Sequence, residues 1–380
     1  MNKKNHTTKK LLVLFLSITA LVGCDKNTKP TSSPNSTINN SVSSDNCRYI
    51  RPYAAYYENG VIYGEDVAMF LDFDTMEKSK LCAVPNCTHD NGTCLAYTVG
   101  NAPVLYNGYI YYFMSNPHVE EDSNGRKLVH DSMLMKASLD SSETEVFSKF
   151  SDSTPSATVN YGYQLVDNIL YFVGNDLNPT TDEYGVLSYS NSGGCHYLCS
   201  INLDTGEYKN YGSIYDGDKQ YDFADNSSQA NIGGWYNGKL YVVYGFIKEK
   251  PPEDATDVYT FHNFEYDPET HTLTESSLPR ASYMDNDTYV YCDKSKNEAT
   301  VIDKGKTYTI PDCNASYVFT TICNNKLFTH DSWYDISDFS KHSLGKQSEF
   351  YSVTYYKEKY IFIKGGKITS LSEDELLSLE

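Results

Sequence analysis

Short runs of alternating apolar and polar residues fill most of this chain, and turn-forming residues separate them. One pattern recurs as a two-residue turn followed by a Tyr-containing apolar strand, as at Asn59-Gly60 before Val61, Ile62 and Tyr63. Asn-Gly favours the type I′ hairpin turn because both residues tolerate a positive φ. We therefore expect an antiparallel hairpin at each copy. The turn anchors are Asn59, Asn107, Asn168, Asn237, Asn286, Asn324 and Glu358.

A second pattern follows the first each time: an alternating strand, an Asp, a short polar turn and another strand, as in residues 200–206. Alternation with period 2 indicates a strand with one buried face. The Asp side chain can bond the backbone that follows it and so fix the turn. This favours a structural role over a catalytic one for these acids. The two patterns together make a unit of two hairpins, which is four antiparallel strands.

Repetition of a four-stranded unit predicts an all-β protein, and specifically a β-propeller. Seven anchors predict seven four-stranded blades, although six or eight also fit because the last copies are weak. The anchors lie between 34 and 69 residues apart, so connections of different length interrupt a common frame. Long connections are expected near residues 116–131, 175–194 and 248–256. A large β-sandwich or a β-solenoid is the competing architecture, and the paired order of the hairpins favours the propeller. The tail after Leu371 predicts a short capped helix or a closing strand.

Tyrosine dominates the aromatic composition, with 35 Tyr against 16 Phe and 2 Trp. Tyr is favoured in strands and packs its ring while its hydroxyl reaches water or a partner. Strand packing explains most of these residues. A Tyr-lined sugar site is the weaker interpretation.

The first 23 residues carry four lysines and no acid, then an apolar run from Leu11 to Leu21, and then Val22-Gly23 before Cys24. A basic segment, a short apolar core and small residues are typical of an export signal. The Cys after the small residue resembles the lipobox of bacterial lipoproteins, which implies that Cys24 receives lipid and becomes the mature N-terminus. An uncleaved anchor helix and a buried helix are the alternatives. The apolar run is short for a membrane span.

This resemblance divides the chain into a signal peptide (residues 1–23), a lipidated Cys with a tether (24–46) and a folded domain (47–380). The tether is rich in Ser, Thr and Asn, so it cannot bury enough surface to fold. The protein is expected on the extracytoplasmic face of the cell membrane, held by the lipid on Cys24. Removal of the signal changes the net charge from −19 to −23, because four lysines are lost. Such an acidic chain is not expected to bind nucleic acid or anionic lipid.

One dense group of metal-ligand side chains lies in residues 81–94: Cys82, Cys87, His89 and Cys94. Three Cys and one His form a closed structural zinc set. The spacing, C-x4-C-x-H-x4-C, is not a standard zinc-finger spacing. An oxidising compartment favours a disulfide, either Cys82–Cys87 or Cys87–Cys94. A structural Zn²⁺, a disulfide and free thiols therefore all remain open at this point.

The other cysteines carry weaker signals. Ten Cys less Cys24 leaves nine, so at least one stays unpaired or pairs with another molecule. Cys292, Cys313 and Cys323 are candidates for disulfides between neighbouring strands. Burial as small apolar residues is the alternative.

The segment Leu-Cys-x-x-Pro-x-Cys-x-His, which contains Cys82, Pro85, Cys87 and His89 and is followed by Cys94-Leu95-Ala96, resembles a segment of uncharacterised Firmicutes lipoproteins with propeller-like repeats. The resemblance covers about sixteen residues. It implies the propeller architecture and carries no assigned activity.

No catalytic signature stands out. Gly-x-Ser-x-Gly, a Walker loop, the dinucleotide glycine fingerprint and His-Glu-x-x-His are all absent from the sequence. We therefore expect a non-catalytic binding protein whose ligand is a protein or a cell-surface or extracellular polymer. The alternative is an extracellular glycan-active hydrolase or lyase, which would gather several acids with raised pKa values at one mouth of the ring. A solute-binding subunit of a transporter is disfavoured, because the strand–helix alternation of two α/β lobes is missing.

Overall fold

The computed structural model describes most of residues 47–379, all within one compact unit of the chain. The signal peptide, Cys24 and the tether lie outside the described residues. Further gaps fall at residues 51–53, 58, 91–93, 99–102, 123–124, 139–141, 150–156, 160–161, 177, 182–186, 191–195, 215–228, 248–258, 286, 294, 314–319, 349, 351 and 365.

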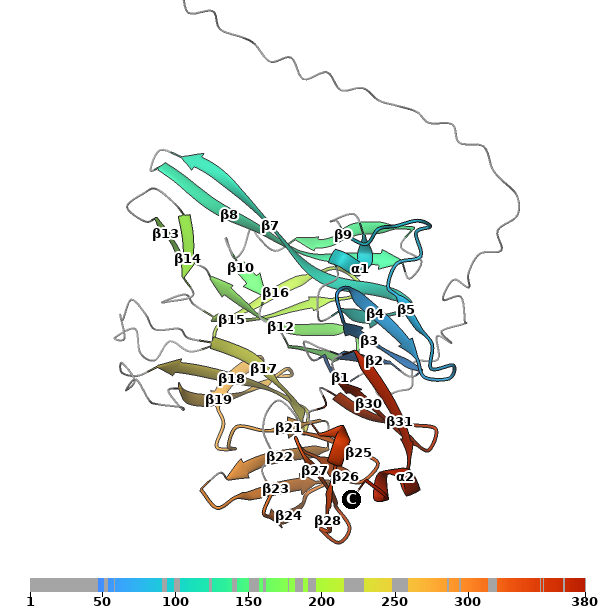
Figure 1. Ribbon diagram of the computed structural model, residues 1–380. Coiled ribbons are helices and arrows are strands. Elements are labelled where there is room, and N and C mark those ends of the chain that lie inside the picture. The colour runs from blue at the N-terminus through green and yellow to red at the C-terminus, as the bar shows by residue number, and fades with distance from the viewer. Residues whose placement is uncertain are drawn as a thin grey trace, which may run out of the picture. The chain divides into compact units, whose positions relative to one another are not determined.

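The described chain is a seven-bladed β-propeller, as the repeat predicts (Figure 1). Each blade is an antiparallel sheet whose strands follow one another in the sequence. Blade 1 comprises β2 (Ala54–Tyr57), β3 (Gly60–Gly64), β4 (Ala68–Asp72) and β5 (Lys78–Lys80). Blade 2 comprises β6 (Val104–Tyr106), β7 (Tyr109–Asp122), β8 (Gly125–Ser138) and β9 (Thr144–Lys149), after helix α1 (Leu95–Thr98).

Blades 3 and 4 follow the same plan, with additions to blade 3. Blade 3 comprises β11 (Tyr163–Val166), β12 (Ile169–Asp176), β15 (His196–Asn202) and β16 (Tyr208–Ser213). Its additions are β1 (Cys47–Ile50), β10 (Ala157–Val159) and the separate hairpin β13 (Asn178–Thr181) and β14 (Leu187–Ser190). Blade 4 comprises β17 (Gln229–Tyr236), β18 (Lys239–Ile247), β19 (Tyr259–Asp267) and β20 (Thr272–Glu275).

The last three blades are the most compact. Blade 5 comprises β21 (Tyr283–Met284), β22 (Thr288–Asp293), β23 (Glu298–Asp303) and β24 (Lys306–Pro311). Blade 6 comprises β25 (Thr321–Cys323), β26 (Lys326–Phe328), β27 (Ser332–Asp335) and β28 (Lys341–Ser343), followed by the 3-10 helix η1 (Gly345–Gln347). Blade 7 has three strands among the described residues, β29 (Ser352–Tyr356), β30 (Lys359–Lys364) and β31 (Lys367–Ser372), and helix α2 (Glu373–Leu377) follows them.

Two of the predicted Asn-Gly turns have the backbone conformation that their residues favour, whereas the first prediction is wrong by one residue, because Gly60 already pairs with Tyr57 as the first residue of β3. Asn107 and Gly108 have φ of 48° and 77°, and Asn237 and Gly238 have φ of 50° and 77°. Both pairs therefore occupy the left-handed region that a type I′ turn requires at its two central residues. The weak seventh copy adopts the same conformation without Asn or Gly, since Lys357 has a φ of 43°.

In the turns between third and fourth strands, one polar side chain stabilises the turn itself and another contacts the preceding blade. Asp72 Oδ1 accepts hydrogen bonds from the backbone N–H groups of Asp74 and Thr75, at 2.8 and 2.9 Å. The next acid reaches the preceding blade: Asp74 Oδ1 accepts a hydrogen bond from the Tyr356 hydroxyl at 2.8 Å and pairs with Lys357. The predicted structural role of these turn acids is confirmed at Asp72.

The same arrangement recurs in blade 3. Asn202 Oδ1 accepts from the N–H groups of Asp204 and Thr205, and Asp204 accepts from the Tyr106 hydroxyl of blade 2 at 2.9 Å. These contacts join turns after first strands to turns after third strands. Both kinds of turn therefore lie at one end of the ring, which we call the turn face.

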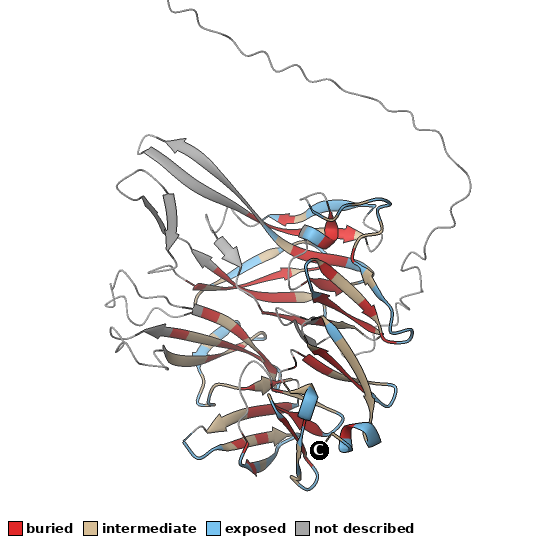
Figure 2. Ribbon diagram, viewed as in Figure 1, coloured by how far each residue is buried: buried red, intermediate tan, exposed pale blue. Residues whose placement is uncertain are grey.

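Seven buried apolar clusters hold the ring together, one at each junction between successive blades (Figure 2). The cluster between blades 7 and 1 contains Ile361 and Ile363 of β30 with Val61, Tyr63 and Leu71 of blade 1. Within the described residues, blades 7 and 1 share no strand. The ring is therefore closed by side-chain packing and by the Asp74 contacts.

The first described strand, β1, does not close the ring either. It pairs antiparallel with β11, the first strand of blade 3, from Cys47 opposite Val166 to Ile50 opposite Tyr163. It also contacts β2 and β17, the first strands of blades 1 and 4. Because first strands of neighbouring blades contact each other around the axis, β1 lies at the inner edge of blade 3.

The chain after β31 is the capped helix that the sequence predicts. The Ser372 side chain accepts from the Glu375 N–H, and the Glu375 side chain accepts from the Ser372 N–H at 2.8 Å. This reciprocal capping box satisfies two donors at the start of α2. Among the described helices, none is long and apolar enough to cross a membrane.

Candidate metal centre and hairpin face

The Cys/His group lies in the connection from β5 to α1, between blades 1 and 2. This connection has no regular secondary structure before α1. The Cys87 N–H donates to the Val84 carbonyl at 3.3 Å, and Asn86 and His89 have φ of 59° and 58°. These tight bends reverse the chain and bring residues that are up to twelve positions apart to one place.

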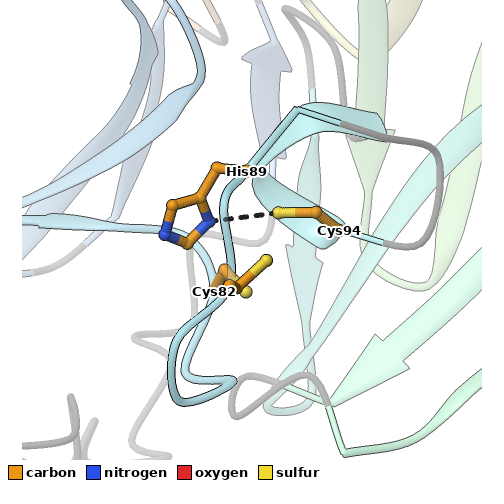
Figure 3. A group of neighbouring side chains, drawn as sticks. Cys82, His89 and Cys94 are labelled. Carbon is orange, nitrogen blue, oxygen red and sulfur yellow. Dashed lines mark hydrogen bonds between the residues drawn. The ribbon is translucent and has the colours of Figure 1, made fainter.

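All four predicted ligands meet there. Figure 3 shows Cys82, His89 and Cys94 side by side. One ligand atom from each of Cys82, Cys87, His89 and Cys94 can be chosen so that all lie within 4.8 Å of one another. His89 Nδ1 is 3.2 Å from Cys94 Sγ, and the Cys94 residue is 1% exposed. The sequence named the four residues, and the structure shows that they form one cluster that could hold a metal such as zinc.

The surroundings give the four groups different proton affinities. The backbone N–H of His89 lowers the pKa of the Cys87 thiol, because it donates to the sulfur and favours the thiolate. Burial raises the pKa of Cys94 to about 11. Burial, with the charge of Lys80, lowers the pKa of His89 and so favours the neutral imidazole, which is the metal-binding form. The surroundings therefore favour the metal-binding forms of two ligands, the Cys87 thiolate and the neutral His89 imidazole.

Four protein ligands leave no open position for water, so a metal here would be structural and not catalytic. The cysteines whose side chains the structure describes, these three included, are free thiols. A disulfide could use two of the three thiols and would leave the third beside His89. The choice between disulfide and metal at this cluster is therefore a matter for experiment.

Cys292, Cys313 and Cys323 are also free. Cys292 and Cys313 belong to one cluster between blades 5 and 6, and the Cys292 thiol lies 3.7 Å from the Cys313 carbonyl oxygen. Cys323 packs in the next cluster, between blades 6 and 7. Burial raises the pKa of both Cys313 and Cys323 to about 12. Their disulfide pairing stays a prediction, and their burial fits the alternative of small apolar residues.

A second feature distinguishes blades 2, 3 and 4 from the rest. In an antiparallel blade, the connection between second and third strands lies at the end opposite the turn face. In blades 1, 5, 6 and 7 this connection is two to four residues long. In blade 2 it is the far half of a hairpin with 14 residues in each strand, β7 and β8, which reach beyond β6 and β9 (Figure 1).

Blades 3 and 4 also extend at this end of the ring. Blade 3 inserts the β13–β14 hairpin at the same point, and β10 pairs with the end of β12 and contacts β8. In blade 4, β18 and β19 pair as far as Ile247 opposite Tyr259, and the chain between them is residues 248–258. We call this end of blades 2–4 the hairpin face.

The sequence located these three segments but missed what they form. It predicted long connections, whereas the first two contain paired strands. The reversal of the first hairpin lies between the paired residues Asp122 and Gly125, inside the predicted connection of residues 116–131. Because these strands extend beyond the blade core, they lack the regular apolar positions of a core strand, and the sequence pattern does not reveal them.

The comparisons with known proteins give similarity of low degree. No family profile and no curated protein sequence matches the chain. Among solved structures, an ulvan lyase of polysaccharide lyase family 25 is similar at 10% identity and a TM-score of 0.41, over 86% of this chain and 94% of that chain. An oligogalacturonate lyase in complex with manganese is similar at 11% identity and a TM-score of 0.30, over 83% of this chain and 75% of that chain.

Proposed function

We propose that this protein is a lipid-anchored propeller that binds a protein or a cell-surface polymer through its hairpin face, outside the cytoplasm. Residues 1–23 are its export signal, Cys24 carries the lipid, and residues 24–46 are the tether. The main observation in support of a binding role is that three successive blades extend at one end of the ring. Long connections on a rigid scaffold are a common means of recognition.

The position of β1 supports an orientation for this surface. Cys47 pairs with Val166, next to the turn between β11 and β12, so the folded chain begins at the turn face. The tether therefore joins the domain at the end opposite the hairpins. We infer that the hairpin face points away from the membrane and toward partners above it.

The net charge of the hairpin face limits the class of partner that it can bind. The three segments of the hairpin face, residues 115–132, 175–196 and 246–260, carry eleven acids and four bases. Such a surface repels anionic polymers, attracts basic ones and does not repel neutral ones. A neutral cell-surface polysaccharide or the basic surface of a protein is the proposed ligand.

Among the described residues, the acids with a shifted pKa have structural partners. A catalytic acid requires a carboxyl whose pKa is raised by its surroundings. The described carboxyl groups with a shifted pKa shift downward, as at Asp74, where Lys357 and then Tyr356 bind the carboxylate, and at Asp267, where the Thr270 and Glu269 N–H groups do so. Ionised, hydrogen-bonded carboxylates of this kind serve turns.

The proposed cofactor is one structural Zn²⁺ at Cys82, Cys87, His89 and Cys94. The cluster geometry supports it, since the four ligand atoms already lie within 4.8 Å of one another. The zinc would supply no reaction step, because the protein occupies all four coordination positions.

The test is binding by the purified full-length chain in detergent to a panel of neutral and anionic polysaccharides and isolated cell walls. In the key variant, Asn-Gly replaces residues 117–130, which leaves the inner halves of β7 and β8 paired. We expect the native chain to bind a neutral polymer or a cell-wall component, and the trimmed variant to lose at least tenfold in affinity.

Two exposed turn-face substitutions, Met76→Ala and Glu269→Gln, serve as matched controls and should bind as the native chain does. Equal affinity of the trimmed and native chains would contradict the assignment of the hairpin face. Release of new reducing ends or of unsaturated sugar products from the polymer would support the glycan-active enzyme instead.

A further inference from the structure

The metal cluster lies beside the root of the β7–β8 hairpin. Leu81, Cys94, Leu95 and Ala96 from the connection belong to one buried cluster with side chains at the inner half of this hairpin. Those hairpin side chains are Ile110, Tyr112, Met133, Met135 and Ala137. The hairpin root thus packs against the chain that carries the four ligands.

The described residues of this connection contain little regular secondary structure. From Leu81 to Asp90 the chain has no regular secondary structure, and α1 has only four residues. A helix that short has no stability of its own in water. Helix α1 begins at Leu95, directly after the predicted ligand Cys94. At the other end of the connection, the Leu81 N–H donates to the Ala68 carbonyl at 2.9 Å.

We propose that Zn²⁺ at Cys82, Cys87, His89 and Cys94 fixes this connection and so holds the root of the β7–β8 hairpin in place. Zinc would bridge both ends of the connection: Cys82 follows β5, and Cys94 precedes α1. The structural part of this inference stands alone, and its consequence for ligand binding rests on the proposed function.

The donor set selects the metal. Three sulfur atoms and one imidazole nitrogen suit Zn²⁺ and its analogue Co²⁺ in tetrahedral geometry, whereas Mg²⁺, Ca²⁺ and Mn²⁺ prefer oxygen ligands. Binding involves no change of oxidation state. Each thiol that is still protonated gives its proton to solvent as its sulfur bonds to the metal.

A disulfide alone would not use all four side chains of the cluster. A disulfide consumes two thiols and leaves the third sulfur within 4.8 Å of a His89 ring nitrogen. One zinc ion uses all four groups at once. It also keeps the thiols from oxidation, since a metal-bound thiolate is not free to attack a disulfide.

The experiment uses the full-length chain in detergent, purified without added metal and then titrated with Co²⁺. We expect one Co²⁺ per chain, with the strong visible bands of a tetrahedral site and thiolate-to-metal charge transfer, and displacement by Zn²⁺. Cys87→Ser should weaken Co²⁺ binding by more than the roughly 10–100-fold that loss of an outer-sphere partner costs. Cys94→Ser is the second ligand variant, and Cys199→Ser, a buried free thiol of blade 3, is the matched control that keeps the site.

Hydrogen exchange measures the structural consequence. Removal of zinc by a chelator should increase exchange in residues 109–114 and 133–138 of the native chain and of Cys199→Ser, and leave blades 5 and 6 unchanged. Full-length chain without bound Co²⁺, with intact mass lower by two hydrogens and two cluster thiols resistant to alkylation, would overturn the proposal in favour of a disulfide. Metal binding without any change in hairpin exchange would overturn the positioning role.

A failure of the proposed binding role would give a different result from a failure of the metal proposal. The trimmed hairpin variant should retain the cobalt spectrum even where it binds no polymer, because its truncation leaves all four ligands in place. Loss of the spectrum in that variant would contradict the separation of the metal site from the distal hairpin.

Discussion

Ile361→Ala is expected to open the ring between blades 7 and 1 and to lower the free energy of unfolding by about 2–5 kcal/mol. Ile361 is 1% exposed and packs with Val61 and Leu71 across the junction. Truncation removes buried methyl groups and leaves a cavity. At the other junctions the chain itself continues from one blade into the next, whereas blades 7 and 1 are joined by side-chain packing and the Asp74 contacts.

The matched control is Ile201→Ala, since Ile201 is fully buried in the cluster between blades 2 and 3. Urea unfolding should show a comparable loss for both variants. Hydrogen exchange should separate them, because only Ile361→Ala should expose β3, β4 and β29–β31 below the unfolding transition. Uniform protection of blades 7 and 1 in Ile361→Ala would contradict closure by packing.

Lys326→Ala is expected to destabilise the protein by about 3 kcal/mol, at the lower end of the cost of breaking a buried ion pair. The Lys326 side chain is 7% exposed, and its Nζ lies 2.7 Å from Glu373 Oε1 and 3.6 Å from Asp335 Oδ2. The ammonium group also lies over the rings of Trp333 and Tyr360. Glu373 is partly exposed, so water recovers some of the loss.

This lysine joins three elements, because it sits in β26, Tyr360 is in β30, and Glu373 begins α2. Tyr360 strengthens the junction: its hydroxyl donates to Glu373 Oε2 at 2.7 Å and accepts from Asn324 Nδ2 at 2.7 Å. Burial, followed by Glu373, raises the Tyr360 pKa, so the hydroxyl keeps the proton that it donates.

Urea unfolding measures the effect, with Lys239→Ala as the control. Lys239 pairs with Glu265 at 2.5 Å on a more exposed surface, so its loss should cost about 1 kcal/mol or less. The double variant Lys326→Met with Glu373→Gln should recover part of the stability, because it removes the Glu373 charge that Lys326 neutralises, while Asp335 keeps its hydrogen bonds from Ser337. Equal effects of Lys326→Ala and Lys239→Ala would contradict the burial argument.

The sequence predicted the propeller because its main signals are local. Asn107-Gly108 and Asn237-Gly238 each specify a turn whose conformation few other residue pairs adopt. Asp72 then specifies the next turn through two backbone hydrogen bonds. Repetition of local signals reveals the blade, and the blade implies the ring.

Features that depend on contacts between distant segments were not predictable. The pairing of β1 with β11 brings Cys47 beside Val166, and no local pattern near Cys47 specifies that partner. The closure of the ring by Ile361 and Leu71 is equally remote in sequence. The four cluster ligands were found because they lie within thirteen residues, but their choice between zinc and a disulfide depends on metal supply and redox state.

The hairpin face was located only as long connections. Its side chains do not complete the blade core, so the apolar alternation that identifies β3 or β30 is weak in residues 115–131. The functional proposal therefore depends on an architectural feature, the extension of blades 2–4 at one end, together with the position of Cys47 at the other.

The most direct test of this account is photo-crosslinking in cells that make the full-length chain. A photoreactive amino acid is placed at Asn124, at the β7–β8 reversal, or at Asn237, in the turn between β17 and β18 on the turn face. The account predicts a covalent partner or polymer adduct from Asn124 and none of the same kind from Asn237. The same adduct from Asn237 with none from Asn124 would contradict a binding head that presents its hairpin face to partners.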